Sequence, residues 1–408
     1  MPGNHRWKLF AMMVLQFFIW GAWLPPLFGI MPGLGFSSTE QALIGSCFAI
    51  ASTVGIFFSN QFADRTFAAE RFLAASHLVG GLALIGLWFT TSFAPFFVLM
   101  LVHSLVYVPT ISITNSLAFA NLTDPKKEFG LVRMGGTVGW IAAAWPLYFI
   151  LGGVAEAELL AAQRSVFLVA GVASLLLAAF SLTLPHTPPK PATGGDHLAW
   201  AKAAAFLKKP FIAVLFAATL IDATIHNGYF VMTYPYLEKI GFAPGDIMPV
   251  MSIGQVAEVL TMAVLGLALK KLGWRTTMIV GILGHAARFA VFAFCRDHSL
   301  IVLVQVLHGI CYAFFFATVY IFIDVYFPKD VRTSAQGLFN LLILGLGDLA
   351  AKWLFVPLTD HYTGADGKVD YPALFLWPTV MALGAAVLLA LMFHPPKVEA
   401  AEPGARAH

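Results

Sequence analysis

The sequence predicts an all-α integral membrane protein with twelve transmembrane helices in two pseudo-symmetric halves of six. Of its 408 residues, 59% are hydrophobic and only 11% are charged, whereas soluble globular proteins have about 45–50% apolar and about 25% charged residues. Uncharged stretches such as residues 166–184 and 374–393 exceed the roughly 18 residues that mark a membrane-spanning helix. Lipid is therefore the expected solvent for most of the chain.

Twelve apolar spans follow one another along the chain when it is read in a window of about 19 residues. The first span has the length of a retained helix and lacks a small-residue cleavage site, so we do not interpret it as a signal peptide. The predicted spans are residues 8–32, 41–63, 72–92, 95–120, 132–153, 164–185, 211–237, 247–270, 275–294, 299–327, 333–358 and 372–394.

The longest polar interruption, rich in proline and lysine, separates the sixth span from the seventh. Such a stretch is typical of a linker. It predicts an N-terminal six-helix bundle (1–185), a cytoplasmic linker (186–209), a C-terminal six-helix bundle (210–394) and a cytoplasmic tail (395–408).

Lysine and arginine are distributed unequally over the predicted loops. Seventeen lie on the side that carries both termini, and four lie on the other side: Arg164, Lys239, Arg296 and Lys368. Because cytoplasmic loops retain positive charge, we expect a multi-pass protein of the bacterial inner membrane with both termini in the cytoplasm. The net charge of +3 comes from scattered loop residues, which does not indicate a nucleic-acid-binding face.

Ionisable side chains within the fifth and eighth spans carry most of the functional information, because such groups are costly in lipid. Arg133 and Thr137 lie in a glycine-rich segment that begins the fifth span, where Arg133 could bind substrate or only anchor a gate. Gln255 and Glu258 share one face of the eighth span. Removal from water disfavours the charged carboxylate, so Glu258 is suited to bind and release a proton; the alternative is a structural ion pair with Arg288.

The seventh and tenth spans add a second set of candidates. Thr224, His226 and Asn227 interrupt the apolar seventh span and offer donors and acceptors for a ligand with hydroxyl groups and a heterocyclic edge. His308 and Tyr312 lie on one stripe of the tenth span. A packing role for a single histidine remains the alternative at His226.

Gln16 and Trp20 share a face of the first span, where an aromatic ring could stack on a planar base. A structural aromatic belt at the membrane interface is the alternative. Asp324, near the cytoplasmic end of the tenth span, is a predicted gating residue. Asp348 and Lys352, four residues apart, are expected to form a structural pair.

The loop after the second span, Asn60-Gln-Phe-Ala-Asp64-Arg65, resembles the G-x-x-x-D-R loop of the major facilitator superfamily, without its leading glycine. The resemblance implies the major facilitator fold, in which two halves rock around a central cavity. Asp64 and Arg65 are therefore predicted gating residues.

Six short motifs resemble the bacterial nucleoside:proton symporters of that superfamily. They are Leu15-Gln-Phe-x-x-Trp20-Gly-x-Trp23-Leu24, Tyr107-x-Pro109-Thr110, Arg133-x-x-Gly136-Thr137-x-Gly139, Gln255-x-x-Glu258, Arg288-Phe-Ala-x-Phe-Ala293 and Arg332-x-Ser334-Ala335-Gln336-Gly337.

This resemblance implies nucleoside contacts from the fifth, seventh and eighth spans and uptake driven by the proton gradient. The implied contacts are Arg133, Thr137, Asn227, Gln255 and Glu258, and we assign proton coupling to Glu258, Arg133 and His308. The sequence departs from the family pattern at Thr224, where a glutamine is expected, at Ala313, where an aspartate is expected, and at His308, where a tyrosine is usual.

We expect a monomeric secondary active transporter for proton-coupled nucleoside uptake, with nucleoside, protons and lipid as partners. It should need no cofactor or metal beyond the proton gradient. Transport of a nucleobase, sugar or drug is an alternative, and a non-transporting membrane sensor is another. An enzyme is not expected, because no GxSxG, HExxH, P-loop or dinucleotide motif occurs in a suitable context.

Overall fold

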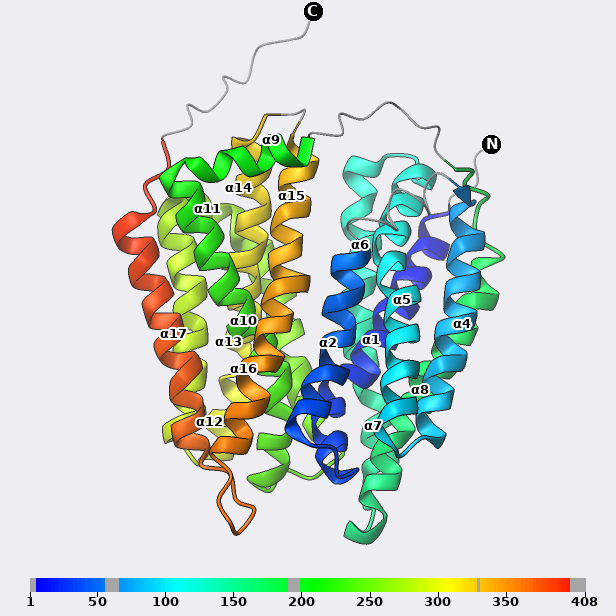
Figure 1. Ribbon diagram of the computed structural model, residues 1–408. Coiled ribbons are helices and arrows are strands. Elements are labelled where there is room, and N and C mark those ends of the chain that lie inside the picture. Colours follow the sequence, from blue (N-terminus) through cyan, green and yellow to red (C-terminus); the bar gives the residue numbers. More distant parts are fainter. Residues whose placement is uncertain (1–4, 56–65, 190–198, 329–330, 397–408) are drawn as a thin grey trace, which may run out of the picture.

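The computed structural model describes residues 5–55, 66–189, 199–328 and 331–396. The regular structure in these residues is helical, apart from one isolated bridge between Thr363 and Val369. The long helices run along one axis in two groups that lie side by side (Figure 1). The start of the first helix and the end of the last lie at the same end of the molecule, as expected for an even number of passes.

Within the described residues, the first group contains seven helices. They are α1 (Arg6–Gly33), α2 (Ser38–Val54), α4 (Ala69–Phe89), α5 (Phe93–Asn121), α6 (Pro125–Ala142), α7 (Ala144–Leu151) and α8 (Glu156–Ser181). α6 and α7 follow one another along a single pass that breaks at Ala143.

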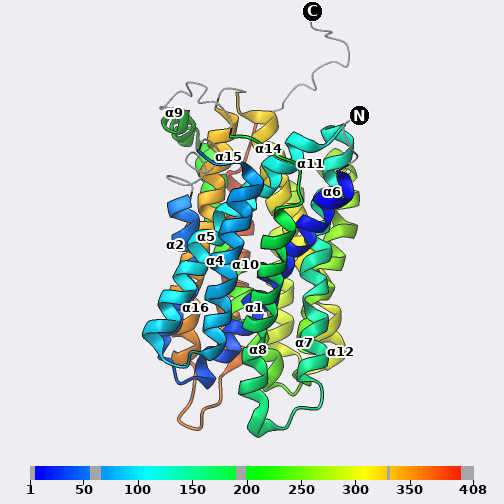
Figure 2. The same cartoon turned by 90° about the vertical axis from the view of Figure 1, so that its right-hand side faces the viewer.

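The second group begins after a short helix, α9 (Ala199–Ala205), which lies across the end of the molecule that carries the termini (Figure 1, Figure 2). Its elements are η2 (Phe206–Lys208), α10 (Pro210–Lys239), α11 (Ile247–Phe294), α12 (His298–Leu303), α13 (Val306–Cys311), η3 (Tyr312–Ala317), α14 (Thr318–Tyr326), α15 (Arg332–Asn340), η4 (Leu341–Leu346), α16 (Gly347–His361) and α17 (Tyr371–Met392). η3 and η4 are π-helical turns within longer helices.

Ten helices of the described residues are long and apolar enough to cross a membrane. α11 accounts for two of the predicted spans: His298, just after it, donates to the carbonyl of Ile240, just before it, at 3.0 Å. A straight helix of that length would extend about 72 Å, so α11 folds back at Gly273, whose φ of 72° is non-helical. With α2, whose described part is 17 residues long, the passes agree with the twelve predicted.

Large apolar side chains on the outer surface are exposed, among them Leu82 (56%), Phe149 (73%) and Leu391 (70%). Contiguous exposed apolar surface is unusual for a soluble monomer. It fits a chain whose solvent is lipid.

Local signals fix where several helices begin. Ser37 and Glu40 form a reciprocal capping box at the start of α2. Asp124 caps α6, with Pro125 in the first turn, and Asp370 caps α17. The sixth span starts at Glu156 rather than at the predicted residue 164, because the amphipathic first turns of α8 extend the helix beyond its apolar core.

Glycine permits the closest helix contacts within the first group. A Cβ on Gly139 of α6 would collide with the carbonyl of Val14 in α1, and a Cβ on Gly171 of α8 would lie 3.0 Å from the carbonyl of Gly81 in α4. Small residues let membrane helices approach closely. They fix α6 against α1, which positions the residues described below.

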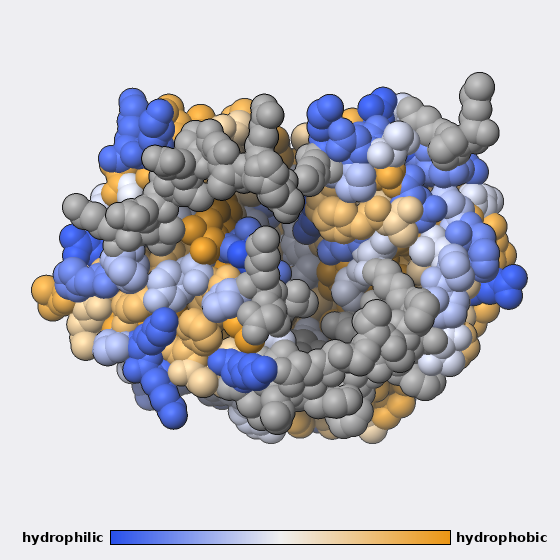
Figure 3. Space-filling view, turned by 90° about the horizontal axis from the view of Figure 1, so that it is seen from above, coloured by the Kyte–Doolittle hydropathy of each residue, from blue (hydrophilic) through white to orange (hydrophobic). Residues whose placement is uncertain are grey.

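Contacts between the two groups gather at the end of the molecule opposite the termini. Gln163 donates to Glu238 at 2.6 Å, and Trp353 donates to Ser46 at 3.2 Å. From the end that carries the termini, the surface is hollowed between the two groups (Figure 3). The molecule is therefore closed at one end and recessed at the other.

Candidate functional site

A cavity of about 470 Å³ lies between the two groups of helices. Its wall combines aromatic rings with polar side chains from both groups. The lining residues are Phe17, Trp20, Leu24, Ser52, Gly55, Val108, Pro109, Ile111, Ser112, Asn115, Arg133, Gly136, Thr137, Trp140, His226, Asn227, Phe230, Gln255, Glu258, His308, Tyr312, Phe316, Tyr320, Asn340, Ile343 and Leu344.

Arg133 and Thr137, one turn apart on α6, contribute the polar part of the first wall. The guanidinium carbon of Arg133 lies 4.4 Å from the centre of the Phe17 ring, a cation–π contact. Gly136 makes room for this arrangement, since a Cβ there would lie 2.5 Å from the nearer Arg133 nitrogen and 2.8 Å from the Phe17 ring. The glycine motif thus holds the cation against an aromatic face at the cavity wall.

Trp20 supplies a flat aromatic surface to the same wall. Its ring stacks on Phe48 with centroids 4.6 Å apart and meets the edge of Trp140 at 5.4 Å. Both neighbours fix the orientation of the indole. A planar ligand in the cavity therefore has a preformed aromatic surface on which to stack.

Asn227 on α10 contributes to the opposite wall. Its Nδ2 donates to the carbonyls of Ala223 at 2.9 Å and Ile343 at 3.2 Å. With both donor hydrogens directed to backbone, its Oδ1 is left as an acceptor for a ligand. Ile343 belongs to the π-helical η4, and such turns occur frequently at functional sites.

Gln255 and Glu258 line the cavity from α11, as their spacing on one helix face predicts. The Oε1 of Gln255 is buried without a hydrogen-bond partner among the described residues. Helix α13 approaches this face closely because of glycine: a Cβ on Gly254 would lie 2.8 Å from the Cβ of His308, and one on Gly309 would collide with the backbone of Glu258.

Arg133 and Glu258 face the cavity from opposite groups of helices and attract each other electrostatically. Arg288, the alternative partner for Glu258, lies elsewhere: its guanidinium donates to His285 and His308. The alternative prediction for Glu258, a structural ion pair with Arg288, is therefore wrong.

Three rings from the second group complete the wall. His226 stacks on His308 with centroids 4.8 Å apart, and Tyr312 lies 6.1 Å from His226. Tyr312 is the first residue of the π-helical η3. The sequence predicts these three residues as candidates, and the structure brings them to one place.

Of the predicted site residues whose positions the structure describes, three do not line the cavity. Gln16 is fully buried, donates to Thr110 at 2.8 Å and accepts from His77 at 2.9 Å. Thr224 donates to the carbonyl of Leu220 on its own helix at 2.8 Å. Their helical faces point into the packed core, so the sequence pattern alone assigned them to the wrong side of the helix.

Asp324, the third, is largely exposed and pairs with Arg332 at 3.1 Å within the second group. Asp64 and Arg65, the predicted gating residues, lie outside the described residues. The expected pair of Asp348 and Lys352 is present.

Several lining residues are absent from the sequence-based site, notably Trp140, Phe230, Tyr320 and Asn340. Tyr320 donates to Asn340 across α14 and α15. Asn340 could have been predicted from the sequence, because it is a polar residue within an apolar span. The sequence does not distinguish Trp140 and Phe230 as cavity residues, because aromatic residues are equally common in packed cores.

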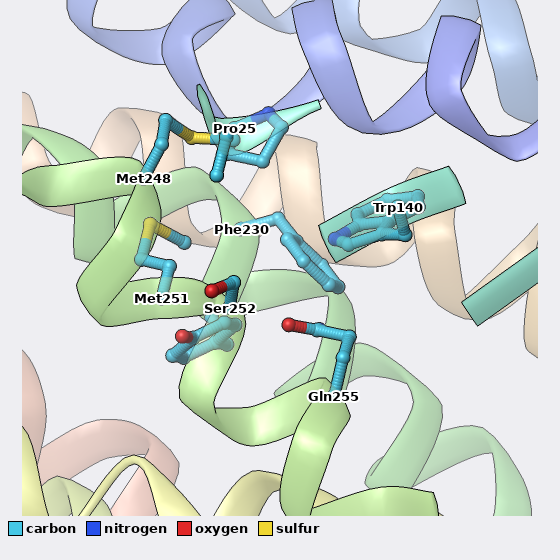
Figure 4. A pocket seen from close by; sticks show the side chains of 9 residues that line it. Pro25, Trp140, Phe230, Met248, Met251, Ser252 and Gln255 are labelled. Carbon is cyan, nitrogen blue, oxygen red and sulfur yellow. The ribbon is translucent and has the colours of Figure 1, made fainter. Parts of the chain in front are cut away.

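Trp140 and Phe230 close the cavity toward the end opposite the termini. Their ring centroids lie 5.8 Å apart across the two groups. Figure 4 shows the Phe230 ring between Trp140 and Gln255, in a closely packed region that also includes Pro25, Met248 and Met251. The cavity is therefore sealed on this side by side chains of both groups.

Known proteins resemble the chain over nearly its whole length. The family model described as "Nucleoside H+ symporter" matches residues 4–398. YegT of Escherichia coli K12 is 34% identical over 355 residues, 84% of this chain and 81% of its own length. The xanthosine permease of the same organism is 28% identical, covering 95% of this chain and 94% of its own length.

Solved structures share the fold. The crystal structure of the nucleoside transporter NupG superposes with a TM-score of 0.83 at 23% identity, over 96% of this chain and 99% of that one. The D-xylose-proton symporter gives 0.71 at 15% identity, over 95% and 97%. The predicted major facilitator fold is thus confirmed, and the chain belongs to the nucleoside H+ symporter family.

Proposed function

We propose that the protein is a secondary active transporter that couples the uptake of a nucleoside to proton movement by alternating access. One observation carries the proposal: Arg133 and Thr137 from one half, and Asn227, Gln255 and Glu258 from the other, line a single cavity. Polar side chains that are costly in lipid thus share one cavity between the two halves, the arrangement on which rocking transport depends.

The cavity suits a small ligand that is partly planar and partly polar. Its volume of about 470 Å³ lies within the roughly 300–1,000 Å³ usual for small-molecule sites. Trp20 and Tyr312 offer rings for stacking on a base, and the free oxygen of Asn227 can accept a hydrogen bond from a ribose hydroxyl or a base N–H group. Relatives named as a xanthosine permease and a nucleoside permease support this substrate class.

Glu258 is the proposed proton carrier, with Arg133 as its counter-charge. When Glu258 is ionised, attraction to Arg133 draws the two halves together at the cavity. Protonation removes that attraction and lets the halves separate. His308, on the cavity wall beside Glu258, is the proposed route for proton exchange.

We further propose that residues 1–185 and 210–394 are the two rocking units and that both termini are cytoplasmic, in the inner membrane of a bacterium. Positive charge on the terminal side supports this orientation. The recess then faces the cytoplasm, so the conformation is inward-facing. Because one chain supplies all the walls of the cavity, a monomer suffices.

Uptake of radiolabelled uridine into proteoliposomes tests the function directly. With an inward proton gradient imposed, we expect uridine to accumulate above its equilibrium level, and collapse of the gradient by a protonophore should abolish the excess. Equal uptake with and without the gradient would remove the symport claim. No uptake of any nucleoside would remove the substrate claim, and binding without translocation would favour a sensor.

A further inference from the structure

A buried cluster of ionisable side chains lies behind the cavity wall in the second half. It comprises Asp222 on α10, His285 and Arg288 on α11, and His308 on α13. Asp222, His285 and Arg288 are 0% exposed, and His308 is 2% exposed. Asp222 lies near the middle of a helix that crosses the membrane. Ionisable groups at that depth generally mark a functional path, yet the proposed transport mechanism uses only His308.

Arg288 fixes the proton positions on two histidines. Its Nη1 donates to Nδ1 of His308 at 2.8 Å, and its Nη2 donates to Nδ1 of His285 at 2.9 Å. A guanidinium has only donors and stays charged, so both Nδ1 atoms act as acceptors. Each neutral ring then carries its hydrogen on Nε2, and the Nε2 of His285 faces a carboxylate oxygen of Asp222 at 3.7 Å.

Asp222 is a buried carboxylate that lacks the hydrogen bonds such a group requires. Both of its oxygens are without a hydrogen-bond partner among the described residues. Leaving an ionised carboxylate in this state is expensive, whereas a protonated carboxyl is tolerated more readily. The side chain is thus arranged to gain and lose a proton rather than to hold one charge permanently.

The charged surroundings of Asp222 are few. Arg288 supplies the nearby positive charge, the thiol of Cys311 on α13 is a further titratable neighbour, and His285 faces Asp222 directly. On α16, which packs on α10, Asp348 and Lys352 neutralise each other. The only titratable side chain of α17 is Tyr371, whose hydroxyl donates a hydrogen bond to the carbonyl of Pro235. α1 has no ionisable side chain between its residues 9 and 33.

Histidine rings connect this carboxyl to the cavity. His226 lines the cavity, and its ring centroid lies 5.7 Å from His285 and 4.8 Å from His308. The Nδ1 of His226 is buried and has no partner among the described residues. An imidazole can accept a proton on one nitrogen and release one from the other. Transfer through His285 therefore requires its Nδ1 to leave Arg288 and accept a proton from His226, while its Nε2 releases its own proton to a carboxylate oxygen of Asp222.

We propose that Asp222 is a second proton-binding carboxylate of this transporter, reached from the cavity through His226 and His285, with Arg288 as its fixed counter-charge. The inference rests on the proposed function, because it assigns a further coupling site to the same transport cycle. Protonation of Asp222 leaves the charge of Arg288 unbalanced directly behind His308. The protonation state of Asp222 thereby changes the electrostatic field at the cavity wall.

Infrared difference spectroscopy tests the proton site without any nucleoside. Purified protein is shifted from mildly alkaline to mildly acidic buffer, and the C=O stretching band of newly protonated carboxyl groups is recorded. We expect the Asp222→Asn variant to lose one such band that the Glu258→Gln variant retains. The control Asp348→Asn/Lys352→Met, which removes another buried pair of the same half, should also retain it. An unchanged band in Asp222→Asn would overturn the proposal.

Transport measurements test the role in coupling. We expect Asp222→Asn to keep uridine counterflow within about twofold of the parent while losing at least half of the stimulation by a proton gradient, and Asp222→Glu to restore it. His285→Gln should also reduce the stimulation of uptake by a proton gradient. This variant provides the test of coupling if Asp222→Asn does not fold. Unchanged stimulation, or equal loss of counterflow and driven uptake, would overturn the coupling role.

The two experiments separate the two proposals. If the parent protein transports no nucleoside, the proposed function fails, while the infrared band still decides whether Asp222 exchanges a proton.

Discussion

Trp140 of the first half and Phe230 of the second half meet with ring centroids 5.8 Å apart and close the cavity at the end opposite the termini. This contact between halves has to break when the protein opens toward that side. Its strength therefore contributes to the balance between the two open conformations.

Replacing Trp140 with alanine should favour the conformation that opens away from the termini. The aromatic pair contributes about 0.5–1.5 kcal/mol beyond burial, so the equilibrium should shift roughly two- to tenfold. The reporter is a cysteine introduced beside the contact, Ser252→Cys, in a background that carries Cys295→Ser. An impermeant maleimide added to intact cells should label this cysteine about two- to tenfold faster when Trp140 is replaced. Trp145→Ala, at a ring that is 52% exposed, is the control; equal labelling in both variants would contradict the closing role.

Glu258→Gln should weaken the coupling of transport to the proton gradient while uridine exchange continues. The amide retains the shape of the side chain but cannot carry a proton, and exchange requires no net proton movement. Stimulation of uptake by an imposed gradient should then fall by at least half, whereas Glu156→Gln on the exposed start of α8 should behave as the parent does. Undiminished gradient stimulation in Glu258→Gln would remove Glu258 as a proton carrier.

Asn227→Ala should weaken uridine binding about three- to tenfold, because a hydrogen bond of about 1 kcal/mol is lost and the side chain that positions it is removed. The matched control is Thr224→Ala, one turn earlier on α10, whose hydroxyl bonds only to its own helix. Isothermal titration of purified protein measures both affinities. Equal losses in the two variants would indicate a general disturbance of α10 instead of a ligand contact.

Gly139→Ala should destabilise the first half, since the added Cβ would collide with the carbonyl of Val14. Overpacking of this kind costs about 1–3 kcal/mol, which should lower the thermal unfolding midpoint measured by tryptophan fluorescence. Gly130→Ala, in the same helix, adds a Cβ that would have no neighbouring atom within 4 Å, so this variant should leave the midpoint unchanged or raise it slightly. A midpoint in Gly139→Ala equal to that of the parent would mean that α1 and α6 can separate freely.

Gln16→Ala should lower stability with little effect on uridine affinity. The change leaves Thr110 and His77 without their buried partner, and an unsatisfied buried polar group costs about 1–3 kcal/mol. Thermal unfolding and titration on the same preparation separate the two effects. A large loss of uridine affinity at unchanged stability would show that Gln16 contributes to substrate binding.

The sequence by itself determined that this chain crosses a membrane many times, because hydrophobic length is a local property of each segment. It also identified the side chains that lipid would not tolerate: Arg133, Asn227, Gln255 and Glu258 were all predicted, and all four line one cavity. Their cost in lipid is a property of each residue, independent of the packing around it.

Only the tertiary structure decided which polar residues face the cavity and which satisfy one another in the core. Gln16 and Thr224 lie on helices with the same pattern as their cavity-lining neighbours, but helical rotation and the neighbouring helices turn them into packed surroundings. Asp222 and Arg288 lie far apart in sequence and meet around His285 only because α11 folds back at Gly273 and returns past α10. Contacts across that distance depend on helix packing, which hydropathy and motif spacing do not encode.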